Sequence, residues 1–77
     1  MARETQAFDI LDEMAATWPS PVVARTEVAT FSGGLLHPRT MANLDSKGEG
    51  PEETVTYGRK RAYVKRSLVA WMRRRMS

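Results

Sequence analysis

The side chains best suited to chemistry in this sequence are basic, and they gather near one end of the chain. Residues 54–77 hold eight Lys or Arg residues and no acidic residue, whereas residues 1–53 hold four basic and nine acidic residues. A positive field concentrated on one part of a small protein attracts a polyanion, because every phosphate that it neutralises releases counterions. We therefore expect a polyanionic partner for residues 54–77. The alternative is a solvated basic surface without a partner.

Patterns of catalytic or metal-binding residues are missing from the sequence. The chain has no cysteine and one histidine, His37, and its carboxylates are scattered. A catalytic site needs a nucleophile, a base and a residue that orients the base, and a zinc site needs several clustered ligands. We therefore expect no enzymatic activity, no catalytic or metal-binding residue, and no cofactor.

The length of the chain limits it to one globular unit. A chain of 77 residues has enough apolar side chains for one hydrophobic core, which buries about 60% of the unfolded surface at this size. The first residues lead into no apolar segment of the kind found in signal peptides, and no stretch approaches the roughly 20 apolar residues of a membrane span. We expect a cytoplasmic protein that has no membrane partner and no small-molecule substrate.

An amphipathic helix is predicted over residues 4–18. Phe8, Leu11, Ala15 and Trp18 recur at helical spacing, and the prolines of Pro19–Pro21 end the helix because they lack a backbone donor. Residues 1–21 are therefore interpreted as an N-terminal helix with a Pro-rich linker, preceding a domain over residues 22–77. The helix either packs on this domain or offers a surface to a second copy or another protein.

Two further short helices are predicted over residues 25–32 and 39–47. Val28 and Phe31 share one side of the first, which Gly33 and Gly34 end. Pro38 suits the start of the second, where its missing N–H costs nothing. We expect Met41 and Leu44 to be buried there, and Gly48 to supply a left-handed cap. Two short helices across a glycine turn form a helix-turn-helix.

The periodicity changes after Gly50 and Pro51. Val55 and Tyr57 alternate with threonines, and residues 62–64 alternate again, which predicts a short hairpin with a basic turn over residues 58–61. A last helix is predicted over residues 66–76, with an apolar face of Leu68, Trp71 and Met72. The expected fold class is mainly α with a small β-hairpin.

Four segments together resemble a known family. They are Phe31–Leu44, Ser46–Pro51, Tyr57–Tyr63 and Ser67–Met72. Their order and spacing resemble those of the excisionase and AlpA-type family of small phage and prophage DNA-binding proteins, which share a MerR-like winged helix-turn-helix. The resemblance implies a winged helix-turn-helix with an extra N-terminal helix, double-stranded DNA as the partner, and association with the bacterial nucleoid.

The resemblance also implies a set of DNA-binding residues. The second helix of the motif enters the major groove, so the residues implied there are His37, Arg39, Thr40, Asn43 and Lys47. Arg39 would bind guanine and Asn43 adenine, while Thr40 would meet a phosphate or a thymine methyl group. The alternative is that these side chains only solvate an exposed helix face.

The wing and the end of the last helix supply the other implied contacts. Arg59, Lys60 and Arg61 at the hairpin turn would reach phosphates or the minor groove, unless they only keep the turn polar. The candidate phosphate contacts of the last helix are Arg73, Arg74 and Arg75, which the helix dipole would also favour for structural reasons.

Two residues depart from the family pattern. His37 stands where a helix-capping serine or threonine is usual, so we expect a weaker or different cap. Lys65 stands where an apolar residue is common, and we expect its side chain to extend past the edge of the core.

Several functions remain open at this point. The leading hypothesis is a prophage-type transcriptional regulator or an excisionase, acting with further copies on adjacent sites or with an integrase. The alternative is a protein-interaction adaptor that works through the N-terminal helix. An RNA or anionic-membrane binder that uses the arginine cluster is a third hypothesis.

Overall fold

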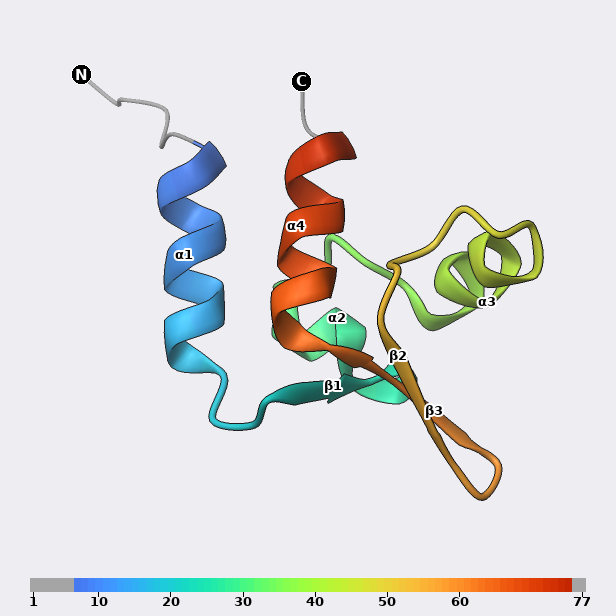
Figure 1. Cartoon of the computed structure of the whole chain (residues 1–77). Helices are drawn as coiled ribbons and strands as arrows, with labels where there is room; N and C mark the ends of the chain where they lie inside the picture. The colour runs from blue at the N-terminus through green and yellow to red at the C-terminus, as the bar shows by residue number, and fades with distance from the viewer. Residues whose placement is uncertain (1–6, 76–77) are drawn as a thin grey trace.

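The structure is a computed structural model that describes residues 7–75. This part of the chain contains four α-helices and one antiparallel sheet of three strands (Figure 1). The elements in chain order are α1 (Ala7–Thr17), β1 (Val22–Ala24), a 3-10 helix η1 (Arg25–Glu27), α2 (Val28–Phe31), α3 (Pro38–Ser46), β2 (Thr54–Tyr57), β3 (Lys60–Val64) and α4 (Lys65–Arg75). None of the helices in this range is long and apolar enough to cross a membrane.

The sheet corrects the prediction of a simple hairpin. Its strand order is β1-β3-β2, because Val22–Ala24, for which the sequence predicts no strand, pairs antiparallel with β3. Val23 lies opposite Tyr63, and both side chains are fully buried. A strand of three residues is too short to show alternation in the sequence, and its partner lies about forty residues further along, so only the tertiary pairing reveals it.

The hairpin turn is tighter than predicted. Only Gly58 and Arg59 connect the strands, because Lys60 and Arg61, expected in the turn, belong to β3. Gly58 has a φ of 62°, as required at the first central position of a type II′ turn. A turn of this type matches the twist of the flanking strands, which therefore continue to the two connecting residues.

The helices near the glycine turn lie close to their predicted positions. The first divides into η1 and α2, and Val28 and Phe31 are buried as expected. α3 begins and ends one residue earlier than predicted, and Gly48 follows it with a φ of 71°. His37 does cap α3, since its Nδ1 accepts a hydrogen bond from the backbone N–H of Arg39 at 3.1 Å. An imidazole nitrogen thus replaces the usual hydroxyl oxygen.

One hydrophobic core joins all the helices to the sheet. Its buried side chains are Leu11, Val23, Val28, Phe31, Met41, Tyr63, Leu68, Val69, Trp71 and Met72. The predicted burial of Met41, Leu68 and Trp71 is confirmed, whereas Leu44 is only half-buried at the edge of this core. Trp71 also donates from Nε1 to the carbonyl of Glu49 at 2.8 Å, which attaches the loop after α3 to α4.

The N-terminal helix packs on the rest of the domain. α1 lies along α4, on the side opposite α3 (Figure 1), and Leu11 is fully buried. Just after α1, Trp18 meets Phe31 edge to face, with the ring centroids 5.6 Å apart. Of the two interpretations of this helix, the structure supports the one in which it enlarges the core. Residues 4–6 of the predicted helix lie outside the described residues.

Lys65 ties the end of α1 to the start of α4. Its Nζ donates to the carbonyls of Ala15 and Trp18 at 2.9 and 3.0 Å, and its backbone N–H donates to the carbonyl of Pro21 at 2.8 Å. The last carbonyls of a helix lack intrahelical partners and carry the negative end of the helix dipole. The side chain extends past the edge of the core, as predicted, but it ends on the terminus of α1.

Removing the charge of Lys65 should therefore loosen α1. In Lys65→Met the stem of the side chain remains while the ammonium is lost, so we expect the free energy of unfolding to fall by about 1–3 kcal/mol. Urea denaturation followed by tryptophan fluorescence measures the change. Lys60→Met is the matched control, because Lys60 is exposed, and it should leave the midpoint unchanged. Equal effects of the two substitutions would contradict this role of Lys65.

Candidate nucleic-acid interface

α3 turns one polar side toward solvent. Arg39, Thr40, Asn43 and Lys47 are all exposed, while Met41, on the opposite side of the helix, is fully buried. We call these four residues the outer face of α3. Their spacing of one, three and four residues keeps them on one side of a helix with 3.6 residues per turn. The predicted recognition residues are therefore brought together, and His37 lies exposed at the N-terminal end of the same helix.

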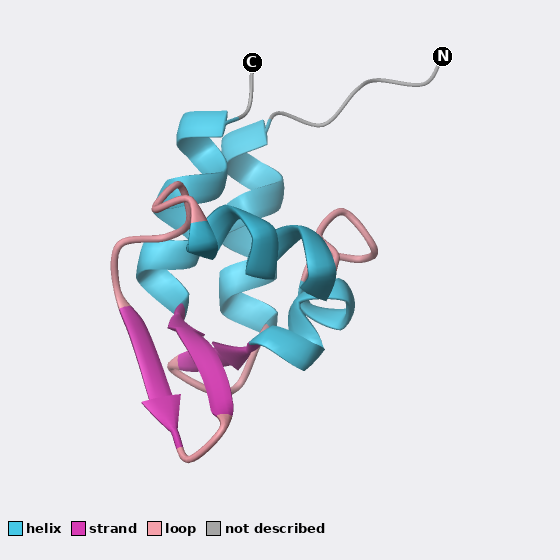
Figure 2. Ribbon diagram, turned by 90° about the vertical axis from the view of Figure 1, so that its right-hand side faces the viewer, coloured by secondary structure: helices cyan, strands magenta, loops and turns pink. Residues whose placement is uncertain are grey.

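The β2–β3 hairpin projects from the same side of the molecule as α3. Figure 2 looks onto this side and shows the hairpin extending beyond α3 from the body of the domain. At the tip, Arg59 and Lys60 are exposed, whereas Arg61 is half-buried. The predicted wing residues thus divide into two that reach solvent freely and one that lies against the body of the protein.

A basic hollow lies between the hairpin and the segment that precedes α2. Its volume is about 240 Å³, and its lining residues are Ala24, Arg25, Thr26, Arg59, Lys60 and Arg61. Four cationic side chains therefore surround one hollow, and two of them, Arg25 and Arg61, also approach the carboxylate of Asp45. The sequence pattern indicates the three hairpin residues but not Arg25 and Thr26, because only the pairing of β1 with β3 brings the two segments together.

The carboxylate of Asp45 joins three elements beneath this surface. Its Oδ2 accepts from Arg25 at 2.5 Å and from the hydroxyl of Tyr63 at 2.6 Å. Arg25 also donates from Nε to the hydroxyl of Tyr63 at 3.1 Å, and Nε of Arg61 lies 3.8 Å from Oδ2. Since Asp45 belongs to α3, Arg25 to η1 and the other two to β3, this network fixes α3 relative to the hairpin.

The network changes the proton affinity of its members. Burial raises the pKa of Tyr63 above its ordinary value, and the hydrogen bond to Asp45 raises it further. The hydrogen bonds to Tyr63 and Asp45 raise the pKa of Arg25. The phenol of Tyr63 and the guanidinium of Arg25 therefore bind their protons more tightly in the folded chain than in the unfolded chain. Nothing in the sequence pattern singled out Asp45 or Arg25, since their partners are distant in the chain.

The absence of a side chain at Gly50 leaves space for the carboxylate of Asp45. A Cβ on Gly50 would lie far inside van der Waals contact of Oδ1 of Asp45, so a larger residue would displace the carboxylate or the loop. The close approach, and not an unusual backbone dihedral angle, explains a glycine at this position. The loop after α3 therefore contributes to the same network.

Ion pairs reduce the charge asymmetry that the sequence predicts. Arg66 pairs with Glu53 at 2.9 Å, and Arg73 pairs with Asp12 of α1. Arg75 lies with its guanidinium carbon 4.9 Å from the centroid of the Trp71 ring, a cation–π geometry. Within the described residues, the cations that form no ion pair with a carboxylate are Arg39, Lys47, Arg59, Lys60, Lys65, Arg74 and Arg75, of which Lys65 donates to backbone carbonyls instead. The unneutralised charge thus concentrates on α3, the hairpin and the end of α4.

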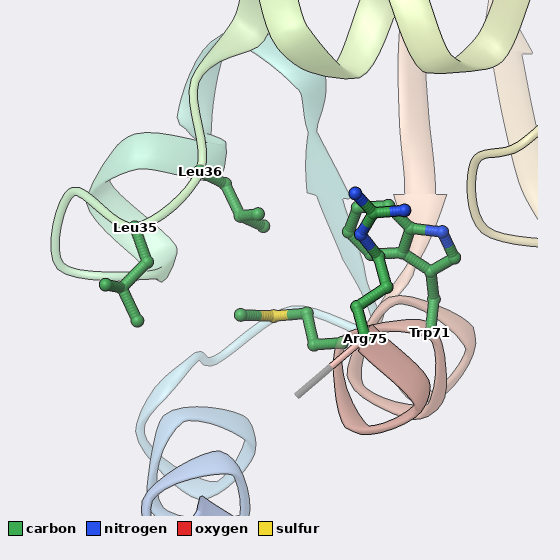
Figure 3. Close-up of a pocket in the computed structure, with 5 residues that line it drawn as sticks. Leu35, Leu36, Trp71 and Arg75 are labelled. Atoms are coloured by element: carbon green, nitrogen blue, oxygen red, sulfur yellow. The ribbon is translucent and has the colours of Figure 1, made fainter. Parts of the chain in front are cut away.

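A small apolar hollow lies at the end of α4. Figure 3 shows Leu35 and Leu36 on one side of it and Trp71 and Arg75 on the other, with Met72 completing the lining. Its volume is about 160 Å³. Leu35 is 67% exposed, so this hollow is a second accessible surface that sequence analysis did not identify.

The chain matches no protein-family model, no curated protein and no solved structure. Its function is therefore inferred from the geometry and charges of its own side chains.

Gly50→Ala tests the close approach to Asp45. We expect the added methyl group to displace the carboxylate and to lower the free energy of unfolding by about 1–3 kcal/mol. In an Asp45→Ala background the same substitution should cost much less, because the obstructing carboxylate is gone. Urea denaturation of the four proteins of this double-mutant cycle measures the coupling. Additive effects would show that Gly50 and Asp45 do not interact.

The raised pKa of Tyr63 predicts a loss of stability at alkaline pH. Because the folded state binds the phenolic proton more tightly than an unfolded chain with a pKa of 10.0, this contribution is complete below about pH 10 and is lost as the pH rises through the folded pKa. We expect the free energy of unfolding to decline more steeply above about pH 10 in the wild type than in Tyr63→Phe.

Absorbance of the phenolate in a Tyr57→Phe background, where Tyr63 is the one remaining tyrosine, reports the titration directly. A Tyr63 that ionises at the same pH in the folded and the urea-unfolded protein would contradict the network.

Proposed function

We propose that the chain binds specific double-stranded DNA, as a small prophage-type transcriptional regulator or excisionase. In this proposal α2 and α3 form a helix-turn-helix, and the β2–β3 hairpin is its wing. The observation that carries the proposal is the outer face of α3 beside the basic hollow. Two residues that line the hollow, Arg25 and Arg61, both contact Asp45 of α3, so the two surfaces have a fixed spacing.

The outer face of α3 would read bases in the major groove. Arg39 has the planar fork that binds O6 and N7 of guanine, and the amide of Asn43 matches N6 and N7 of adenine. Thr40 would meet a phosphate or a thymine methyl group, and Lys47 would lie near the backbone at the far end of the helix. His37 uses Nδ1 as an acceptor within the chain, which leaves Nε2–H as a donor for a phosphate.

The wing and the basic hollow would bind the DNA backbone. Arg59 and Lys60 are exposed at the turn, within reach of phosphates or of a narrow minor groove. Arg25 and Thr26 extend the group of donors to the base of the hairpin. These contacts would set affinity and orientation without reading sequence. Arg73 pairs with Asp12 and Arg75 lies over the Trp71 ring, whereas Arg74 is exposed and pairs with no carboxylate of the described residues.

The packing of α1 gives less support to the alternative of a protein-interaction adaptor. It depended on an apolar side of the N-terminal helix that is free to meet a partner, but Leu11 is fully buried, and Met14 and Ala15 pack against the core. DNA binding therefore accounts better for the exposed polar side of α3 and for the cations that remain unneutralised.

The first experiment selects binding sites from a random duplex pool and measures the affinity for the best site and for a scrambled duplex at two salt concentrations. For Asn43→Ala we expect a loss of about 1–3 kcal/mol of discrimination between the duplexes. The double variant Arg59→Ala/Lys60→Ala should weaken binding to both duplexes alike and lower the slope of log K against log salt by about 0.9 for each lost phosphate contact.

Glu13→Ala is the control, because Glu13 is exposed on α1, away from α3, and it should leave both affinities unchanged. Failure of the wild type to bind any duplex at low salt would refute the proposal. A loss of sequence preference in the wing variant, rather than in Asn43→Ala, would refute the division of roles.

A further inference from the structure

Two of the four cations that line the basic hollow already pair with a carboxylate of the fold. Nη2 of Arg25 lies 2.5 Å from Oδ2 of Asp45, and Nε of Arg61 lies 3.8 Å from the same oxygen. Arg59 and Lys60, which line the same hollow, form no ion pair with a carboxylate of the described residues. The hollow is therefore less positive than its four cations alone would make it.

Asp45 is close to this hollow without lining it. Its side chain is only 10% exposed, whereas the side chains of Arg25 and Arg61 are 29% and 35% exposed and belong to the lining. A ligand in the hollow would therefore contact the two guanidinium groups and not the carboxylate. Asp45 can affect such a ligand only through its charge and through the orientation of these arginines.

The orientation of Arg25 is set by two hydrogen bonds. Nε donates to the hydroxyl of Tyr63 at 3.1 Å, and Nη2 donates to Oδ2 of Asp45 at 2.5 Å. A guanidinium has five N–H donors in one plane, so three remain after these two bonds, and both N–H groups of Nη1 are among them. Because one edge of the plane is held, the remaining donors keep a fixed direction relative to α3, which carries Asp45.

The carboxylate has two opposite effects on a bound polyanion. Its negative charge beside two cations weakens the attraction for any phosphate, whatever the base sequence. Its hydrogen-bond acceptors keep the arginines at one position relative to the outer face of α3. A phosphate in the hollow and bases at that face are then met at a fixed spacing, which favours only a duplex whose bases match.

We propose that Asp45 determines the specificity of the proposed DNA complex, by restraining Arg25 and Arg61 so that the basic hollow accepts a phosphate in register with the outer face of α3. The inference rests on the proposed function for its ligand, duplex DNA. Asp45 touches no DNA in this complex and is a positioning residue. Specificity of this kind comes from weakening the wrong complexes as well as from contacts to the right one.

Two substitutions separate the charge of Asp45 from its hydrogen bonds. Asp45→Asn removes the charge, while the amide oxygen can still accept from Arg25 and Tyr63. We expect its affinities for the best site of the selection and for the scrambled duplex to rise together by about three- to tenfold, with an unchanged ratio. Asp45→Ala also removes the acceptor. Its affinity for the scrambled duplex should rise likewise, while its preference for the best site falls by about fivefold or more.

The direction of these changes distinguishes positioning from a purely structural role. A variant that only loses its fold would bind both duplexes more weakly, whereas we expect tighter binding to the scrambled duplex. Circular dichroism under the binding conditions shows which variants are folded. Glu13→Gln is the matched control, because it makes the same change of net charge as Asp45→Asn at an exposed site on α1. It should leave both affinities and their ratio unchanged.

A short heparin fragment separates this inference from the proposed function. Heparin is a polyanion without bases, so its affinity reports the cations alone. Both Asp45 variants should bind it more tightly than the wild type does, whether or not DNA is the partner. A wild type that binds no duplex would overturn the proposed function and the effect on specificity, while the heparin comparison decides separately whether Asp45 restrains the hollow.

Two results would overturn the inference even if the wild type binds its best site with a clear preference. One is an Asp45→Asn variant that binds heparin and the scrambled duplex no more tightly than the wild type. The other is a folded Asp45→Ala variant that keeps the full preference for the best site.

Discussion

The carboxylate of Asp45 is the contact on which the geometry of the candidate interface depends. α3 is short and its outer side is polar, so burial of Met41 by itself would leave its orientation poorly determined. The hydrogen bonds that Arg25 and Tyr63 donate to Asp45 connect the end of α3 to η1 and β3. A buried carboxylate is costly unless it is paired and hydrogen-bonded, and here both partners donate to the same oxygen. We infer that the network contributes more to the orientation of α3 than to the net free energy of unfolding.

The same network accounts for features that have no explanation when taken alone. Gly50 leaves space for the carboxylate, Tyr63 places a hydroxyl at the edge of an apolar core, and Arg25 stands at the boundary of β1 and η1. Tyr63 is buried as a ring but satisfied at its hydroxyl, as buried tyrosines usually are. Arg25 and Arg61, which both approach Asp45, also line the basic hollow.

A small chain compensates for its limited core with contacts at the ends of its helices. α1 contributes Leu11 to the core, and Lys65 and Trp18 attach its last turn through hydrogen bonds to backbone carbonyls. His37 performs a similar task at the start of α3. The contacts of Lys65 and His37 satisfy polar groups that helix ends leave open, and that of Lys65 also connects elements that are distant in the chain.

The sequence by itself determined the positions of the helices, most of the buried side chains and the exposed side of α3. Those features follow from local periodicity, from glycine and proline, and from capping, all of which act within a few residues. Only the tertiary structure decided that Val22–Ala24 is a strand, that Arg25 joins the basic hollow, and that Arg73 pairs with Asp12. Each of these depends on contacts between residues far apart in the chain, so no local pattern carries them. The charge asymmetry of the sequence likewise overstates the unpaired positive charge of residues 54–77 in the folded chain. Folding brings acidic residues of the first part of the chain against basic residues of the last part and so neutralises several of these cations.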